Sequence, residues 1–231
     1  MILSPSTKLS DAIFSDPSLI PVVNRFGIFL GVGDATIGEV CLRHGLTPDF
    51  FLAVVNTFLN EDYFPADVAS TLPADKVVEY LLLTDRYYEA AMIPNIERHF
   101  RTLMARSPRD NNLPLLWDFF AEMRTELLTC ITDDRKHRFP LIVRLFEGGV
   151  QTVDGQDALD AMPEAVARRS VGDKLADLEA FFVMHLRGEY DRNLCMAVVS
   201  AIFTLSKDIR QNNRIRERIL SPLARLLISN R

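Results

Sequence analysis

Four long stretches of the chain carry apolar residues at alternating spacings of three and four. This is the period of an α-helix that buries one face, so the stretches predict helices at about residues 73–106, 113–146, 162–187 and 193–228. Most connections between them are short, and an antiparallel four-helix bundle is the simplest way to bury four such faces. The one long connection, at residues 148–160, is polar and predicts a surface loop.

Shorter helical patterns occupy the first 66 residues and predict helices at about 8–15, 16–26, 36–44 and 48–60. The pairs Asp16-Pro17 and Thr47-Pro48 are typical of helix starts, because Asp or Thr can cap and proline suits the first turn. Strand signals are nearly absent. We therefore predict an all-α protein, with a small helical domain at residues 1–66 and a four-helix bundle at residues 67–231.

Polar residues interrupt each of the four apolar stripes close to its middle. In a helical bundle, one polar layer at mid-height is the usual geometry of a buried metal site. Most side chains of this layer are poor metal ligands, and two are cations. The interrupting residues are Asp85 in the first stripe, Cys130 and Asp134 in the second, Arg168 in the third, and Asn212 and Arg216 in the fourth.

The histidines do not supply the missing ligands. His99 lies 14 residues after Asp85, which is about 21 Å along a helix. His137 and His185 fall on the continued stripes but several residues from the layer, and His44 belongs to the other predicted domain. Ligands of one metal centre must converge on one layer, so we predict no metal ligands and no cofactor, with a di-iron site as the alternative.

Three of the stripes share a further feature, a proline just past the polar layer. Each proline removes a hydrogen bond to the carbonyl four residues earlier, so we predict a kink in each helix at this point. The spacing of Cys130, Asp134 and Pro140 equals that of Asn212, Arg216 and Pro222, and Pro94 lies nine residues after Asp85.

Composition narrows the class of protein. The chain has 231 residues, of which 48% are hydrophobic, and a net charge of −5, so it can bury a core and offers no overall positive charge for nucleic acid or an acidic membrane. Cys41, Cys130 and Cys195 are odd in number and widely spaced, which favours a reducing compartment. No secretory pattern opens the sequence and no apolar run has the length of a membrane span. We expect a cytoplasmic protein.

Residues 36–56 have the spacing of a helix-turn-helix. A DNA-reading helix needs polar and basic side chains, whereas the second helix here reads Asp-Phe-Phe-Leu-Ala-Val-Val-Asn. Residues 1–66 also contain three Lys or Arg and seven Asp or Glu, which disfavours phosphate contact. The pattern favours a helical packing module without a nucleic-acid partner.

Several segments resemble the RIC family, the di-iron proteins that repair iron–sulfur clusters. The first part of the chain is similar to the small helical domain that opens RIC proteins, and the remainder is similar to their hemerythrin-like four-helix bundle. The resemblance covers nearly the whole chain and rests on scattered positions. They are residues 19–28, 36–41 and 44–46 in the first part, and residues 84–88, 93–97, 126–130, 139–140 and 219–222 in the second.

The resemblance implies a di-iron site with histidine or glutamate at each position of the polar layer. Here none of those positions keeps its histidine, and one carboxylate survives, shortened, as Asp134. The RIC domain also carries a Cys-Cys pair where this chain has Gly31-Val32, so thiol chemistry is not indicated there. No histidine stands at a spacing that would activate Cys130, and we expect no enzymatic activity.

Three interpretations of the polar layer remain. In the first, Arg168 and Arg216 replace the metal cations and pair with Asp85 and Asp134, because buried charges need partners. In the second, the long arginine side chains reach solvent at the edges of the stripes. In the third, the emptied pocket binds a small anion or metabolite.

The leading prediction is a metal-free, non-catalytic hemerythrin-like protein with a regulatory or protein-interaction role in stress response. Its partner would be a protein, not nucleic acid or a membrane, and a homodimer is among the arrangements left open. The first alternative is a di-iron protein for iron–sulfur cluster repair or nitric-oxide response. The second alternative is a transcriptional regulator.

Overall fold

The protein is all-helical, as the sequence predicts. A computed structural model describes residues 2–66, 71–148 and 164–229, and within these residues the only β-type pairing is an isolated bridge between Lys8 and Thr36. None of the described helices is long and apolar enough to cross a membrane. The loop predicted at residues 148–160 lies, except for Gly148, outside the described residues.

The chain divides into two compact units. The first unit consists of residues 1–84, 141–157 and 211–231, and the second consists of residues 85–140 and 158–210. The domain boundary predicted between residues 66 and 67 adjoins residues 67–70, which lie outside the described part of the chain, and it stays a prediction.

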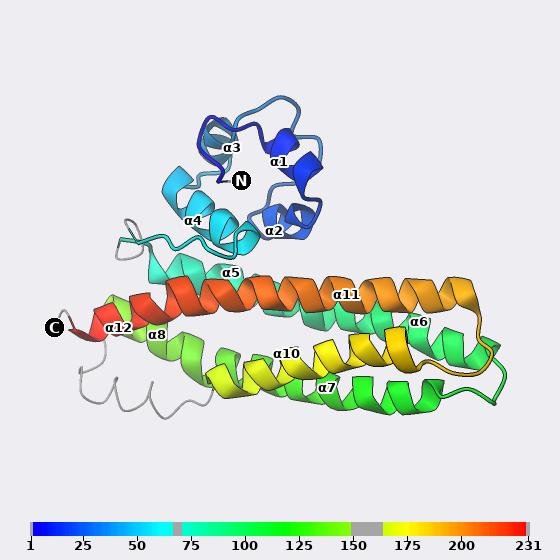
Figure 1. Cartoon of the computed structure of the whole chain (residues 1–231). Helices are drawn as coiled ribbons and strands as arrows, with labels where there is room; N and C mark the ends of the chain where they lie inside the picture. Colours follow the sequence, from blue (N-terminus) through cyan, green and yellow to red (C-terminus); the bar gives the residue numbers. More distant parts are fainter. Residues whose placement is uncertain (1, 67–70, 149–163, 230–231) are drawn as a thin grey trace. The chain divides into compact units, whose positions relative to one another are not determined.

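Four short helices open the first unit (Figure 1): α1 (Leu9–Ser15), α2 (Leu19–Arg25), α3 (Ile37–Arg43) and α4 (Pro48–Leu59). All four were predicted, but α2 begins later than Asp16-Pro17. Asp16 is extended and its backbone N–H still bonds to Ala12 of α1, while its side chain accepts a hydrogen bond from the Ser18 N–H at 3.0 Å. Asp16 therefore ends one helix and organises the turn before the next.

A capping box starts α3. The Thr36 hydroxyl accepts from the Glu39 N–H at 3.3 Å, and the Glu39 carboxylate accepts from the Thr36 N–H at 2.8 Å. Two N–H groups of the first turn are thereby satisfied. The hydrogen bond from the Thr36 backbone holds the pKa of Glu39 below its ordinary value.

This pKa shift predicts a pH-dependent contribution of Glu39. Because the folded protein binds the charged form of Glu39 in this hydrogen bond, the pKa of Glu39 is lower in the folded than in the unfolded chain. The charged side chain therefore stabilises the fold above the ordinary pKa of 4.5, and this stabilisation is lost as the pH falls through the lowered folded pKa. Glu39→Gln should therefore lower the free energy of unfolding at pH 7, and the difference from wild type should shrink on acidification. Urea unfolding at several pH values measures it, and a difference that stays constant into the acid range would contradict the role of the charge.

The long helical stretches agree with the sequence prediction to within two residues at every described end. Each is interrupted or ended by a five-residue π-helical segment, in which hydrogen bonds span five residues instead of four. In chain order, the elements are α5 (Ala74–Tyr87), η1 (Tyr88–Met92), α6 (Ile93–Arg106), α7 (Leu113–Asp133), η2 (Asp134–Arg138), α8 (Phe139–Glu147), α10 (Glu164–Ala180), η3 (Phe181–His185), α11 (Arg192–Ile215), η4 (Arg216–Leu220) and α12 (Ser221–Ser229).

A π-helical segment precedes each of the three prolines at which the sequence predicts a kink, and the kinks themselves stay a prediction. η1, η2 and η4 each end two residues before a proline, and the N–H of the residue just before that proline bonds to the carbonyl five residues back. The acceptors are the carbonyls of Tyr88, Asp134 and Arg216. The wider turn satisfies the backbone where a proline cannot donate, so the helix continues.

A π-helical turn also shifts the buried face of the helix that follows it. The predicted stripes placed His137 and His185 on buried faces, and this is wrong, because both side chains are exposed. His137 lies in η2 and His185 ends η3. After η2, Phe139 and Ile142 are buried together with Leu141 and Leu145 of the predicted stripe, so the buried face of α8 is wider than the stripe.

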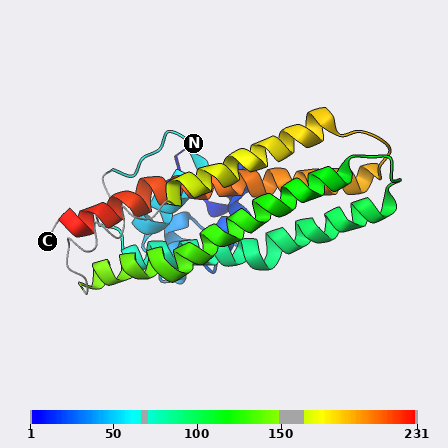
Figure 2. The same cartoon turned by 90° about the horizontal axis from the view of Figure 1, so that it is seen from below.

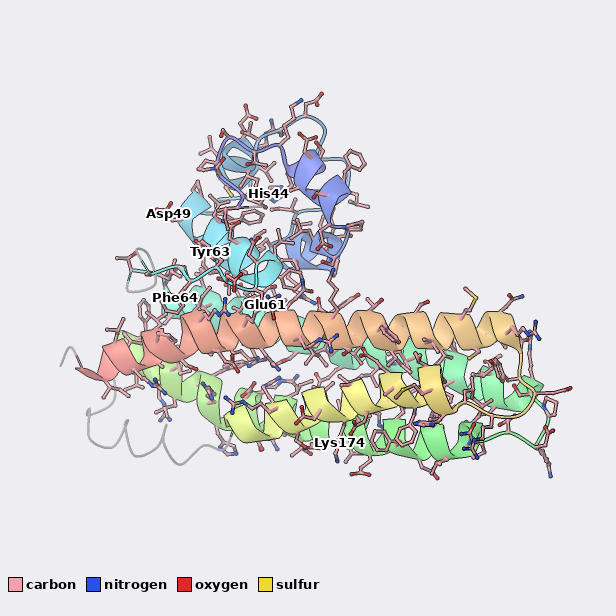
Figure 3. All side chains as sticks on the ribbon, in the orientation of Figure 1. His44, Asp49, Glu61, Tyr63, Phe64 and Lys174 are labelled. Carbon is pink, nitrogen blue, oxygen red and sulfur yellow. The ribbon has the colours of Figure 1, made fainter. Side chains whose placement is uncertain are left out.

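The second unit is built on one apolar core. α6, α7, α10 and the part of α11 before residue 211 lie side by side, with successive helices running in opposite directions (Figures 1 and 2). Phe100, Phe120, Leu175 and Ile202, one from each helix, are all fully buried in this core. On the surface, Lys174 of α10 pairs with Glu122 and Glu126 of α7 (Figure 3).

Candidate functional site

A buried arginine–carboxylate centre occupies the polar layer in the second unit. The Arg168 side chain, from α10, is 7% exposed, and its Nη2 donates a hydrogen bond to Oδ2 of Asp134, which is 3% exposed. The same Nη2 lies 3.9 Å from Oδ1 of Asp85, which is fully buried. One cation thus faces two carboxylates in a water-poor environment, where such interactions are much stronger than in water.

The helices explain why these groups meet. Cys130 and Asp134 are four residues apart on α7 and the start of η2, so they share one face. α10 packs along α7 and brings Arg168 onto that face. Burial raises the pKa of the Cys130 thiol, and the neighbouring Arg168 cation opposes that rise.

The other two positions of the predicted layer belong to the first unit. Asn212 is buried, and its Oδ1 accepts a hydrogen bond from the Tyr80 hydroxyl at 3.2 Å. Arg216 is only 3% exposed. With Arg168 at 6% and Arg216 at 3% exposure, neither arginine reaches solvent, so the second interpretation of the layer does not describe these side chains. A network of all six residues stays a prediction.

Sequence reasoning missed a second buried polar pair. The Tyr88 hydroxyl donates to Oδ2 of Asp208 at 2.6 Å, and both residues are buried. The signal was present, because Asp208, Asn212 and Arg216 follow one another at spacings of four.

Removing the Tyr88 hydroxyl should be costly although it leaves the ring in the core. Tyr88→Phe takes one donor from a buried carboxylate, and we expect a loss of about 1–3 kcal/mol in the free energy of unfolding. Tyr190→Phe, on a partly exposed ring of the same unit, is the matched control and should change stability by less than about 0.5 kcal/mol. Chemical denaturation measures both, and equal effects would contradict a special role of the Tyr88–Asp208 bond.

The side chains present do not fit a di-iron site. Within the described ranges, no three His, Cys, Asp or Glu side chains cluster as metal ligands. The guanidinium of Arg168 lies against Asp134, the one position of the layer where both this chain and the RIC pattern have a carboxylate. A metal ion there would meet a buried positive charge and would lack nitrogen ligands.

The cysteines are buried free thiols. Burial raises the pKa of Cys41 to about 11, and it also raises the pKa of Cys195. Nucleophilic and metal-binding cysteines act as thiolates, which these environments disfavour. Gly31-Val32 lies in the segment between α2 and α3, with Gly31 at φ +99°.

Comparison with known proteins gives no family. No protein-family model, no curated protein and no solved structure matches this chain. The RIC and hemerythrin-like assignment therefore stays a prediction that rests on the resemblance of the sequence.

Proposed function

We propose that this chain is a divergent RIC-like protein whose hemerythrin-like bundle is metal-free, and that it acts by binding a protein partner in a regulatory or stress-response role. The observation that carries the proposal is the buried ion pair between Arg168 and Asp134, with Asp85 nearby. At the positions where the family would hold iron, this chain supplies its own fixed cation.

The physical argument concerns charge. Two buried carboxylates, Asp85 and Asp134, would repel one another without a cation close to both. A guanidinium is permanently charged and presents several donors in a plane, which suits carboxylate oxygens. Arg168 can therefore keep the polar layer stable with no ion bound, and the bundle can serve as a rigid scaffold.

The chemistry of the remaining groups favours binding over catalysis. Cys41, Cys130 and Cys195 are buried with raised pKa values. His137 and His185 are exposed and have no place in the polar layer. The part of the chain that interacts would therefore be its surface, with the core providing shape.

The test is an iron titration with a positive control built from the family pattern. Ferrous iron is added to the purified protein without oxygen, air is admitted, and bound iron and the near-ultraviolet oxo-bridge band are measured. The control variant carries Asp85→His, Cys130→His, Asp134→Glu, Arg168→His, Asn212→His and Arg216→Glu.

We expect wild type to retain no stoichiometric iron and to develop no oxo-bridge band, and the control variant to gain both. About two irons per wild-type chain would contradict the metal-free function and favour the cluster-repair alternative. A folded control variant that binds no iron would contradict the placement of the six positions on the family pattern.

A further inference from the structure

An apolar strip lies on the surface of the second unit, where α7 and α10 pack side by side (Figure 1). The rings of Phe119 and Phe181 are only partly buried, and their centroids lie 5.6 Å apart. The exposed ring of His185 lies 5.7 Å from that of Phe181. Leu115, one turn before Phe119, is 62% exposed. A continuous strip from two helices is typical of a surface that binds a partner, unlike single exposed apolar residues.

Carboxylates continue the strip along both helices. Lys174 of α10 pairs with Glu122, and its Nζ lies 2.9 Å from Oε2 of Glu126 (Figure 3). Asp118 lies one turn before Glu122, and Asp177 lies one turn before Phe181. One cation therefore stands among four carboxylates, which gives a formal charge of −3. The strip and these five charged residues together are termed the α7–α10 face.

Other cations of the unit do not cancel this charge. Arg124 of α7 pairs with Glu97 of α6, on the other side of its helix. Arg169 is five residues from Lys174, which turns it about 140° around α10. Asp118 and Asp177 are exposed and form no ion pair within the part of the chain that the structure describes. The connections between α6 and α7 and between η3 and α11 contain two arginines and three carboxylates, so they add no positive charge.

The extent of the face fits one helix. From Leu115 to Glu126 it spans about 16 Å, or three turns of α7. The surface of two packed antiparallel helices accepts a third helix, whose side chains at every third and fourth position form the contact. Apolar residues on that stripe would cover the strip, and lysine or arginine beside the stripe would meet the carboxylates.

We propose that the α7–α10 face binds an amphipathic helix of a partner protein, with an apolar stripe flanked by lysine or arginine. The stripe packs on Leu115, Phe119 and Phe181, and the flanking cations meet Asp118 and Asp177. This inference rests on the proposed binding function and names the chemistry of the partner. It uses no residue of the polar layer.

The probe is a fluorescent helical peptide of about 18 residues, or five turns, with leucine at every third and fourth position and lysine beside this stripe. Its control peptide has glutamate in place of lysine. Fluorescence anisotropy with the full chain at about 0.1 M salt measures both affinities. We expect saturable binding of the lysine peptide and at least about tenfold weaker binding of the glutamate peptide, because its charges repel those of the face.

A pair of charge reversals tests the carboxylates. Asp118→Lys combined with Asp177→Lys should weaken binding of the lysine peptide at least about tenfold, because two attractions become repulsions. Asp11→Lys combined with Asp49→Lys makes the same change in net charge at exposed positions of the first unit, and it should weaken binding less than about twofold. All four positions are exposed, so circular dichroism should stay that of wild type.

A second pair of variants tests the apolar strip. Leu115→Ser should weaken binding of the lysine peptide about three- to tenfold, because a half-exposed leucine loses part of its apolar contact. Leu42→Ser is the matched control, since Leu42 is 83% exposed on α3, and it should leave the affinity unchanged.

The proposal is overturned if wild type does not bind the lysine peptide, if the glutamate peptide binds equally well, or if either variant of the face behaves like its control. A chain that is dimeric in solution and becomes monomeric on Leu115→Ser would also overturn it, because a second copy would then cover the face. The iron titration is a separate readout. A metal-free chain that fails only the peptide test loses this face and keeps the proposed function, whereas two irons per chain with normal peptide binding contradict the metal-free function alone.

Discussion

Replacing Asp134 by alanine is expected to lower the free energy of unfolding by about 3–5 kcal/mol, because it removes a carboxylate that pairs with a buried cation. The Arg168 side chain is only 7% exposed and comes from a helix that packs along α7, so water gives its charge little compensation. The Asp85 carboxylate, 3.9 Å from the Arg168 Nη2, still attracts the guanidinium after Asp134 is removed. We therefore do not expect the loss to exceed this range.

The neighbouring residue provides a matched control. Asp133 is exposed and carries the same charge, so Asp133→Ala should change stability by less than about 0.5 kcal/mol. A double-mutant cycle with Arg168→Met then isolates the pair, and we expect a coupling energy of about 1–3 kcal/mol. Similar, small losses for Asp134→Ala and Asp133→Ala would mean that the layer is solvated and that the pair contributes little.

Replacing Gly188 by alanine is expected to cost about 3 kcal/mol or more, from two causes that add. Gly188 has a φ of +80°, which an L side chain rarely adopts. A Cβ at this position would lie 2.6 Å from the Asp110 carbonyl oxygen and 2.7 Å from the Asn111 Cα, both backbone atoms that cannot move alone.

The surrounding hydrogen bonds make this clash hard to relieve. The Asn112 side chain donates to the His185 carbonyl and accepts from the Arg187 N–H, both at 2.8 Å, and Asn111 donates to the Glu189 carbonyl at 3.1 Å. The connection between α6 and α7 and the connection between η3 and α11 are therefore held together by hydrogen bonds around Gly188. A shift large enough to admit a methyl group would break several of these bonds.

A second glycine serves as the control, with the opposite sign expected. Gly172 lies inside α10, and a Cβ there would meet no atom within 4 Å. Gly172→Ala should raise the free energy of unfolding by about 0.5–1 kcal/mol, because alanine loses less backbone entropy in a helix. Thermal or urea unfolding of both variants measures these changes in stability. A Gly188→Ala protein as stable as wild type would contradict the close packing of the two connections around Gly188.

The helices could be predicted from the sequence because their signals are local. The spacing of apolar residues predicted the described ends of the long helices to within two residues, and proline or glycine lies close to most of these ends. The π-helical segments were not foreseen, although the prolines pointed to a backbone irregularity. The consequence was the wrong placement of His137 and His185, because one wider turn changes which side chains face the core.

The candidate sites were predictable only in part, because several of their contacts join residues that lie far apart in the sequence. Arg168 and Asp134 stand out in the sequence because a charge on an apolar stripe needs a partner. The Tyr88–Asp208 bond joins residues 120 positions apart, and the contact between Arg25 and Tyr80 spans 55 positions. The only local signal in these two pairs is the spacing of four between Asp208 and Asn212, whereas Arg25 has the ordinary pattern of a cation in the last turn of a helix.

The central claim of the proposed function is that Arg168 stands where the RIC family, which the sequence resembles, would hold iron. Crystals of protein expressed in iron-rich medium, with diffraction measured at the iron absorption edge, test it most directly. The account predicts density for the Arg168 guanidinium against Asp134 and no anomalous peak in the polar layer. Two anomalous peaks about 3.5–4 Å apart beside Asp134, with the guanidinium displaced, would contradict it.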